Sequence, residues 1–84
     1  MKDSEIRDVL LRILQDMVPE ENVAKLEPHV RIRDQIDLDS MDFVNFLVAV
    51  DEQLGVETPE KDYPKLATLD RCIAYFRSRL AAAT

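Results

Sequence analysis

A long amphipathic helix begins within the stretch Ile36-Asp37-Leu38-Asp39-Ser40-Met41-Asp42-Phe43-Val44. Asp39 is a predicted N-cap, because its short carboxylate side chain accepts a hydrogen bond from the unpaired N–H groups of a first helical turn. Asp42 adds a second acid to that turn, where the helix dipole favours negative charge. Ser40 is therefore expected at an exposed corner between loop and helix, where a phosphate ester can be attached to its hydroxyl.

This helix is expected to run from Asp39 to Leu54. Gly55 follows at the position where a left-handed cap is least strained. The apolar residues recur at helical spacing and form one stripe, which predicts a buried face. The stripe consists of Phe43, Phe46, Leu47, Val50 and Leu54.

Two further long helices show the same periodicity. One is predicted over Ser4–Met17, with Asp3 or Ser4 as its cap and Pro19 ending it. The other is predicted over about Thr68–Leu80, with Thr68 as its cap, and the Ala81–Thr84 tail is expected to fray.

The two connections are expected to be held by apolar anchors. The connection from Val18 to Leu38 is long for a structureless loop, and Pro19 is expected to open a short helical turn within it. In the second connection a short helix is expected at about Glu60–Tyr63. The predicted fold is all-α, with three long helices, a short third one and a single domain over residues 1–84. The expected anchors of the long connection are Val23, Leu26, Val30, Ile32, Ile36 and Leu38.

Composition narrows the class of partner. The 84 residues carry 17 acids and 11 bases, a net charge of −6, which argues against nucleic-acid binding and favours basic partner surfaces. One cysteine, Cys72, excludes an internal disulfide and is expected in the core. There is no run of 18 apolar residues and no signal peptide, so a cytoplasmic protein without membrane insertion is expected.

The span from Asp34 to Glu60 contains eight acids and no Lys or Arg, which gives the helix after Ser40 an acidic face. A second apolar set, formed by Met41, Val44 and Val48, is offset from the stripe described above. It is either buried against the bundle or available to a partner or a tethered acyl chain.

These residues resemble the acyl carrier protein family over nearly the whole chain, from Ser4 to Phe76. Asp39-Ser40-Met41 is similar to the family's Asp-Ser-Leu, and the acidic pair Asp51-Glu52 and Pro59 follow at matching spacing. The resemblance implies the four-helix carrier fold. It also implies that Ser40, beside Asp39, receives 4′-phosphopantetheine from coenzyme A through a Mg-dependent phosphopantetheinyl transferase.

The resemblance further implies a partner-facing helix for acyl-loading and acyl-transfer enzymes with basic surfaces. The expected partner-binding residues are Asp39, Met41, Asp42, Val44, Val48, Asp51 and Glu52. An interior cavity for an acyl chain would be bordered by Phe46, Val50, Leu54, Tyr63, Leu66 and Ile73.

The sequence also departs from the family pattern. Asp37 stands where Gly is frequent, and the preceding loop carries Arg31 and Arg33. Phe43 and Phe46 are bulkier than the usual residues. These departures favour a specialised or secondary carrier over a housekeeping role in fatty-acid synthesis.

Other classes of function fit the residues less well. The carboxylates of Asp34, Asp37, Asp39 and Asp42 do not have the spacing of a calcium loop, so no metal site is predicted. An enzyme would have to use the single His29, in a chain whose 84 residues leave little room for a shaped pocket. A plain helical interaction domain would need no modification at Ser40.

The sequence therefore predicts a monomeric acyl carrier protein that is not itself an enzyme. It would hold an acyl group as a thioester on an arm at Ser40 and shuttle it between enzymes of fatty-acid, polyketide or related synthesis. An aminoacyl or D-alanyl carrier protein is the alternative within the family.

Overall fold

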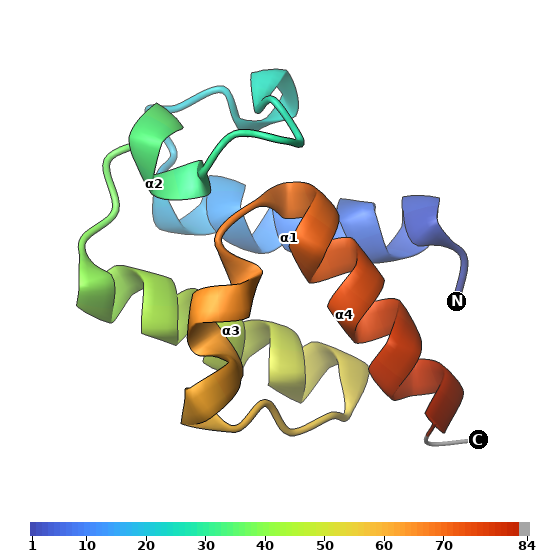
Figure 1. The fold of residues 1–84 in the computed structure, drawn as a ribbon. Coiled ribbons are helices and arrows are strands. Elements are labelled where there is room, and N and C mark those ends of the chain that lie inside the picture. The colour runs from blue at the N-terminus through green and yellow to red at the C-terminus, as the bar shows by residue number, and fades with distance from the viewer. Residues whose placement is uncertain (83–84) are drawn as a thin grey trace.

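The computed structural model describes residues 1–82 and contains helices only (Figure 1). Among the described residues the one β pairing is an isolated bridge between Arg31 and Thr68. The all-α prediction is confirmed. The three long helices are α1, α3 and α4, and the shorter helix predicted before the last one is η2. The elements in chain order are α1 (Asp3–Met17), the 3-10 turn η1 (Val23–Lys25), α2 (Ile32–Gln35), α3 (Ser40–Leu54), the 3-10 helix η2 (Glu60–Leu66) and α4 (Leu69–Ala82).

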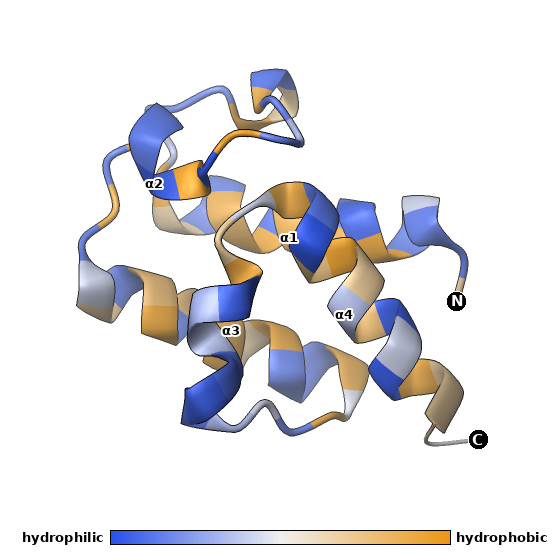
Figure 2. Ribbon diagram, in the orientation of Figure 1, coloured by the Kyte–Doolittle hydropathy of each residue, from blue (hydrophilic) through white to orange (hydrophobic). Residues whose placement is uncertain are grey.

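The core lies where α1 packs against α3 and α4, and η2 closes it by packing against α4. Figure 2 shows hydrophobic positions recurring along α1, α3 and α4, as the helical period requires. Burying one large apolar side chain contributes about 1.5–3 kcal/mol, so these contacts hold the bundle together. The fully buried side chains are Ile6, Leu10, Leu14, Ile32, Phe46, Leu47, Val50, Leu66, Leu69, Cys72 and Phe76.

Both ends of α3 are fixed by the residues that the sequence indicates. The Asp39 carboxylate accepts from the Asp42 N–H at 2.8 Å, and the Asp42 carboxylate accepts from the Asp39 N–H at 3.4 Å. Gly55 ends the helix at φ 67°, in the left-handed region. The helix therefore starts at Ser40, with Asp39 as its cap.

The other caps agree only in part with the sequence predictions. Thr68 caps α4 as predicted, because its hydroxyl accepts from the Arg71 N–H at 3.2 Å. The cap of α1 was predicted at Asp3 or Ser4, which is wrong: Lys2 holds that position, and its N–H donates to Glu5 at 2.7 Å. A further difference is that α4 includes Ala81 and Ala82, while the rest of the tail expected to fray, residues 83–84, lies outside the described residues.

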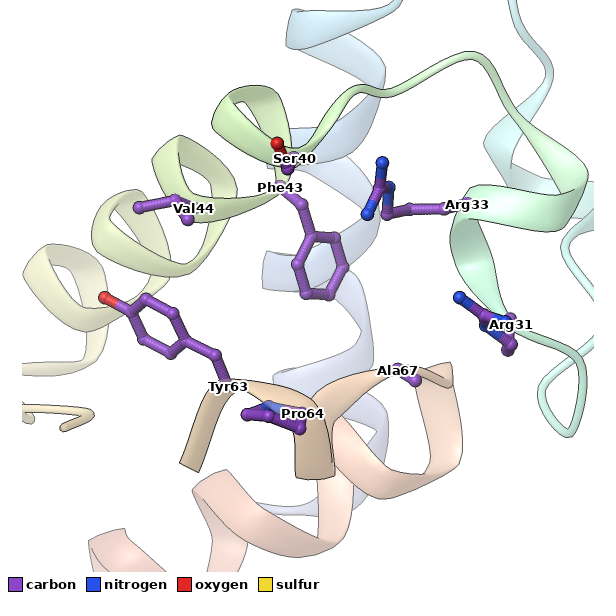
Figure 3. A pocket seen from close by; sticks show the side chains of 8 residues that line it. All are labelled: Arg31, Arg33, Ser40, Phe43, Val44, Tyr63, Pro64 and Ala67. Atoms are coloured by element: carbon purple, nitrogen blue, oxygen red, sulfur yellow. The ribbon is translucent and has the colours of Figure 1, made fainter. Parts of the chain in front are cut away.

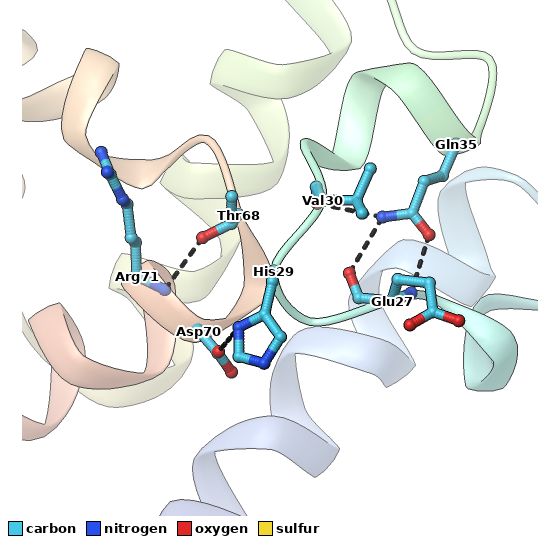
Figure 4. Close-up of polar contacts among 7 residues, drawn as sticks. All are labelled: Glu27, His29, Val30, Gln35, Thr68, Asp70 and Arg71. Atoms are coloured by element: carbon cyan, nitrogen blue, oxygen red, sulfur yellow. Dashed lines mark hydrogen bonds and ion pairs between the residues drawn. The ribbon is translucent and has the colours of Figure 1, made fainter.

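The long connection differs most from the predictions. Its helical turn is η1, which begins at Val23 and not at Pro19, and α2 was not predicted at all. Val30 is 43% exposed and is no anchor, whereas the other five predicted anchors are buried. The Gln35 side chain does the fastening there, since it accepts from the Glu27 N–H at 2.7 Å and donates to the Glu27 and Val30 carbonyls at 3.0 Å (Figure 4).

Among residues 1–82, no helix combines the length and the apolar composition that crossing a bilayer requires.

Candidate functional site

Ser40 is the first residue of α3 and is exposed. Because Asp39 accepts the hydrogen bond that caps the helix, the Ser40 hydroxyl is not needed for that task. Within the described part of the chain the hydroxyl makes no hydrogen bond. The result is a free primary hydroxyl on a rigid helix end, a geometry suited to covalent attachment of a group.

An open cavity of about 440 Å³ lies beside this hydroxyl (Figure 3). One side comes from α3, through Phe43 and Val44, and the opposite side from the η2 segment. The third side is formed by Arg31 and Arg33, at the start of α2 and within it. The lining residues are Arg31, Arg33, Ser40, Phe43, Val44, Tyr63, Pro64 and Ala67.

This cavity is not the one that the family resemblance implies. Of the six residues expected to border an interior acyl cavity, only Tyr63 lines it. Phe46, Val50 and Leu66 are fully buried and pack in the core. Pro64 and Ala67 were not predicted at the site, because only the packing of η2 against α4 places them across the cavity from Ser40.

The outer face of α3 combines acids with exposed apolar side chains. Met41 is 65% and Val48 is 42% exposed, while Val44 is partly buried at the cavity. Glu52 is exposed and Asp42 is partly buried through its bond to Asp39. A surface of this composition offers both apolar contact area and negative charge to a partner.

Asp51 differs from its neighbours on α3. Its carboxylate accepts from the Thr58 hydroxyl at 2.6 Å and from the Thr58 N–H at 2.9 Å. These bonds turn the side chain toward the loop after α3, so Asp51 has a structural task that the sequence reasoning missed. No local sequence signal indicates a bond across seven residues.

The remaining chemically reactive side chains lie away from Ser40. His29 is exposed and pairs with Asp70, its Nδ1 lying 2.5 Å from Oδ2 (Figure 4). Burial raises the pKa of the Cys72 thiol to about 12, and the thiol donates to the Leu66 carbonyl at 3.3 Å. In residues 1–82 no group of three or more His, Cys, Asp or Glu side chains is placed to hold a metal ion.

Comparison with known proteins connects this geometry to a family. An acyl carrier protein of Thermosynechococcus vestitus is 29% identical over 85 residues, covering 98% of this chain and 100% of the relative. Acyl carrier protein 2, mitochondrial, of Arabidopsis thaliana is 25% identical, covering 89% of this chain and 59% of the relative.

A solved structure of the acyl carrier protein from Enterococcus faecalis superposes with a TM-score of 0.78 at 19% identity. It covers 94% of this chain and 99% of the other, which supports the fold. The family model described as "Phosphopantetheine attachment site" matches residues 4–76. The chain therefore belongs to the phosphopantetheine attachment site family, the acyl carrier proteins, which are carriers rather than enzymes and whose cofactor is covalently attached 4′-phosphopantetheine.

Proposed function

We propose that Ser40 is the attachment residue and that the chain carries an acyl group between biosynthetic enzymes. The observation that carries this proposal is the free Ser40 hydroxyl at the start of α3, beside an open cavity. The attached arm supplies a thiol, which holds the acyl group as a thioester. Attachment forms a bond between the Ser40 oxygen and the pantetheine-side phosphorus of coenzyme A and breaks the P–O–P bond of its pyrophosphate. Adenosine 3′,5′-bisphosphate leaves, and the Ser40 hydroxyl proton is released.

The residues around Ser40 fit such an arm. The hydroxyl needs no rearrangement of the cap to become available, because Asp39 and Asp42 cap the helix by themselves. The cavity beside it offers apolar walls from Phe43, Val44 and Tyr63 for part of the arm or its cargo. The chain's own task is to hold the attachment point rigidly and to shield what is attached.

Intact mass tests this proposal directly. The protein is incubated with coenzyme A, Mg²⁺ and a broad-specificity phosphopantetheinyl transferase, and a gain of one phosphopantetheinyl group is expected. The gain is expected to be absent in Ser40→Ala and retained in Ser78→Ala, the matched control at an exposed position of α4. No gain in the folded wild-type protein would favour an unmodified helical interaction domain.

We further propose that the outer face of α3 docks the transferase and the acyl-handling enzymes through basic surfaces. The proposed contact residues are Asp39, Met41, Asp42, Val44, Val48, Asp51 and Glu52, with Asp51 acting mainly by shaping the face through Thr58. Exposed Met41 and Val48 supply apolar contact, and Glu52 supplies exposed charge.

Charge reversal separates docking from overall charge. Glu52→Lys is expected to slow modification of Ser40 at low salt, since long-range attraction accelerates encounter and is screened by salt. Glu20→Lys changes the net charge equally from an exposed position after α1 and is expected to act much less. Equal effects of the two variants would contradict a docking role for Glu52.

The acyl group that is carried and the pathway that uses it belong to the same proposal. Fatty-acid, polyketide or related synthesis is proposed as the pathway class, and an aminoacyl or D-alanyl carrier is the alternative. Thioester loading with acyl and aminoacyl donors, followed by mass analysis, distinguishes them. The monomeric state and the cytoplasmic location stay predictions, and one relative is named as mitochondrial.

A further inference from the structure

Two arginines line the cavity beside Ser40 and lack acidic partners. Arg31 and Arg33 both face the cavity, across from Phe43, Tyr63 and the rest of the apolar wall (Figure 3). In the described part of the chain neither guanidinium takes part in a salt bridge. Among the eleven Lys and Arg side chains, Lys65 and Arg77 form salt bridges, so what sets Arg31 and Arg33 apart is their place at the cavity beside Ser40.

Hydrogen bonds hold the Arg33 side chain and the backbone at Arg31 in place beside the cavity. The Arg33 Nε donates to the Leu38 carbonyl at 3.1 Å, two residues before Ser40. This bond leaves the two terminal nitrogens of Arg33 available. Arg31 is bridged to Thr68, and the next N–H, of Ile32, donates to the Ala67 carbonyl at 2.9 Å.

The acids nearest in sequence do not neutralise this pair. Asp34 and Asp37 make no side-chain bond to either arginine, and Asp39 and Asp42 bond to each other's backbone in the cap of α3. Guanidinium groups are suited to binding a carboxylate or phosphate with two parallel hydrogen bonds. The cavity therefore has a cationic side and an apolar side, both within reach of Ser40.

We propose that Arg31 and Arg33 bind an anionic oxygen group carried on the arm at Ser40. The inference rests on the proposed attachment at that residue. Two sources supply this chemistry: the phosphodiester that joins the arm to Ser40, and a carboxylate at the far end of an acyl cargo. In the second case the cavity selects dicarboxylic acyl groups over simple fatty acyl groups, with the chain methylenes against Phe43 and Tyr63.

The test follows the Arg Nε–Hε signals in nitrogen–proton correlation spectra of the full chain. Four forms are compared: unmodified, phosphopantetheinylated, and loaded from hexanoyl- or adipoyl-coenzyme A. The Arg31→Gln and Arg33→Gln variants assign the signals, and Arg71, on α4 and outside the cavity, is the internal control. The comparison itself is made among wild-type forms, and the variants serve only to assign the signals.

A shift of the Arg31 and Arg33 signals on phosphopantetheinylation, unchanged by either cargo, supports the phosphodiester. A shift only in the adipoyl form supports the cargo carboxylate. Signals that move no more than that of Arg71 in all forms overturn the inference, while the mass gain at Ser40 keeps the proposed function. Absence of the mass gain overturns both.

A stability measurement gives a second readout. Where an anion is bound, the modified wild-type protein is expected to melt about 4–8 °C above the modified Arg31→Gln/Arg33→Gln double variant, beyond any difference between the unmodified forms. Arg71→Gln is expected to show no such added difference. An equal change on modification in all three proteins contradicts the inference.

Discussion

Thr58 donates two hydrogen bonds to the carboxylate of Asp51, from its hydroxyl at 2.6 Å and from its backbone N–H at 2.9 Å. Thr58 is the one buried polar residue among those described, with 8% exposure. Asp51 lies in the last turn of α3, where the helix dipole disfavours an acid. The two bonds offset the unfavourable interaction of the Asp51 carboxylate with the helix dipole. They also attach the loop after α3 to the helix that carries Ser40.

Asp51→Ala is expected to lower the free energy of unfolding by about 1–3 kcal/mol, because it leaves two buried donors of Thr58 without an acceptor. Urea denaturation measures the change. Glu52→Ala, one residue along and exposed, is the matched control and is expected to change stability by less than about 0.5 kcal/mol. Similar losses in the two variants would show that the bonds to Thr58 contribute little.

Asp39→Ala is expected to destabilise the protein by about 0.5–2 kcal/mol, because the first turn of α3 loses its cap. Asn caps helices about as well as Asp, so Asp39→Asn is expected to retain stability. Denaturant midpoints of both variants measure the change in stability. Asp37→Ala is the control, because Asp37 lies in the same loop and caps no helix. If Asp39→Asn were as unstable as Asp39→Ala, the carboxylate charge and not the cap would matter.

The sequence predicts the parts of this fold that depend on local periodicity and capping. The stripe on α3, its Asp39 cap and its Gly55 end agree with the structure, because each depends on residues within a few positions of one another. The cap of α1 was missed since Lys2, an unusual cap, is supported by Glu5.

Features held by polar contacts between residues of neighbouring segments were not predictable in the same way. Gln35 fastens α2 to the loop before it through Glu27 and Val30, and hydrophobic periodicity does not register a glutamine. The candidate site divides similarly. Ser40 is predictable from its helix start, whereas the cavity beside it depends on the packing of η2 against α4, which no local pattern indicates.

Acid is expected to weaken a contact between η2 and α4. The Tyr75 hydroxyl donates to Asp62 at 2.8 Å, and this bond, with that from Lys65, lowers the pKa of Asp62 below its ordinary value of 3.8. A lowered pKa in the folded state means that the stabilisation is present above pH 3.8 and is lost as the pH falls through the folded-state pKa.

Tyr75→Phe removes the donor and keeps the ring, so wild type is expected to exceed this variant in stability at pH 7 and by a smaller margin at pH 3, below the ordinary pKa of Asp62. Urea midpoints at pH 7, 5 and 3 measure the difference. Tyr63→Phe is the control, because the Tyr63 hydroxyl makes no hydrogen bond among the described residues. A difference between wild type and Tyr75→Phe that is constant across this range would contradict the linkage.

Cys72 is expected to be chemically silent in the folded protein. Its thiol is fully buried, donates to the Leu66 carbonyl and has a pKa raised to about 12 by burial, so the reactive thiolate is scarce at pH 8. A thiol reagent such as 5,5′-dithiobis(2-nitrobenzoate) is expected to find no reactive thiol in the unmodified protein and one in the phosphopantetheinylated protein. In denaturant the counts are expected to rise to one and two. Rapid labelling of the folded, unmodified chain would show that Cys72 is accessible and would let it compete with the arm for acyl groups.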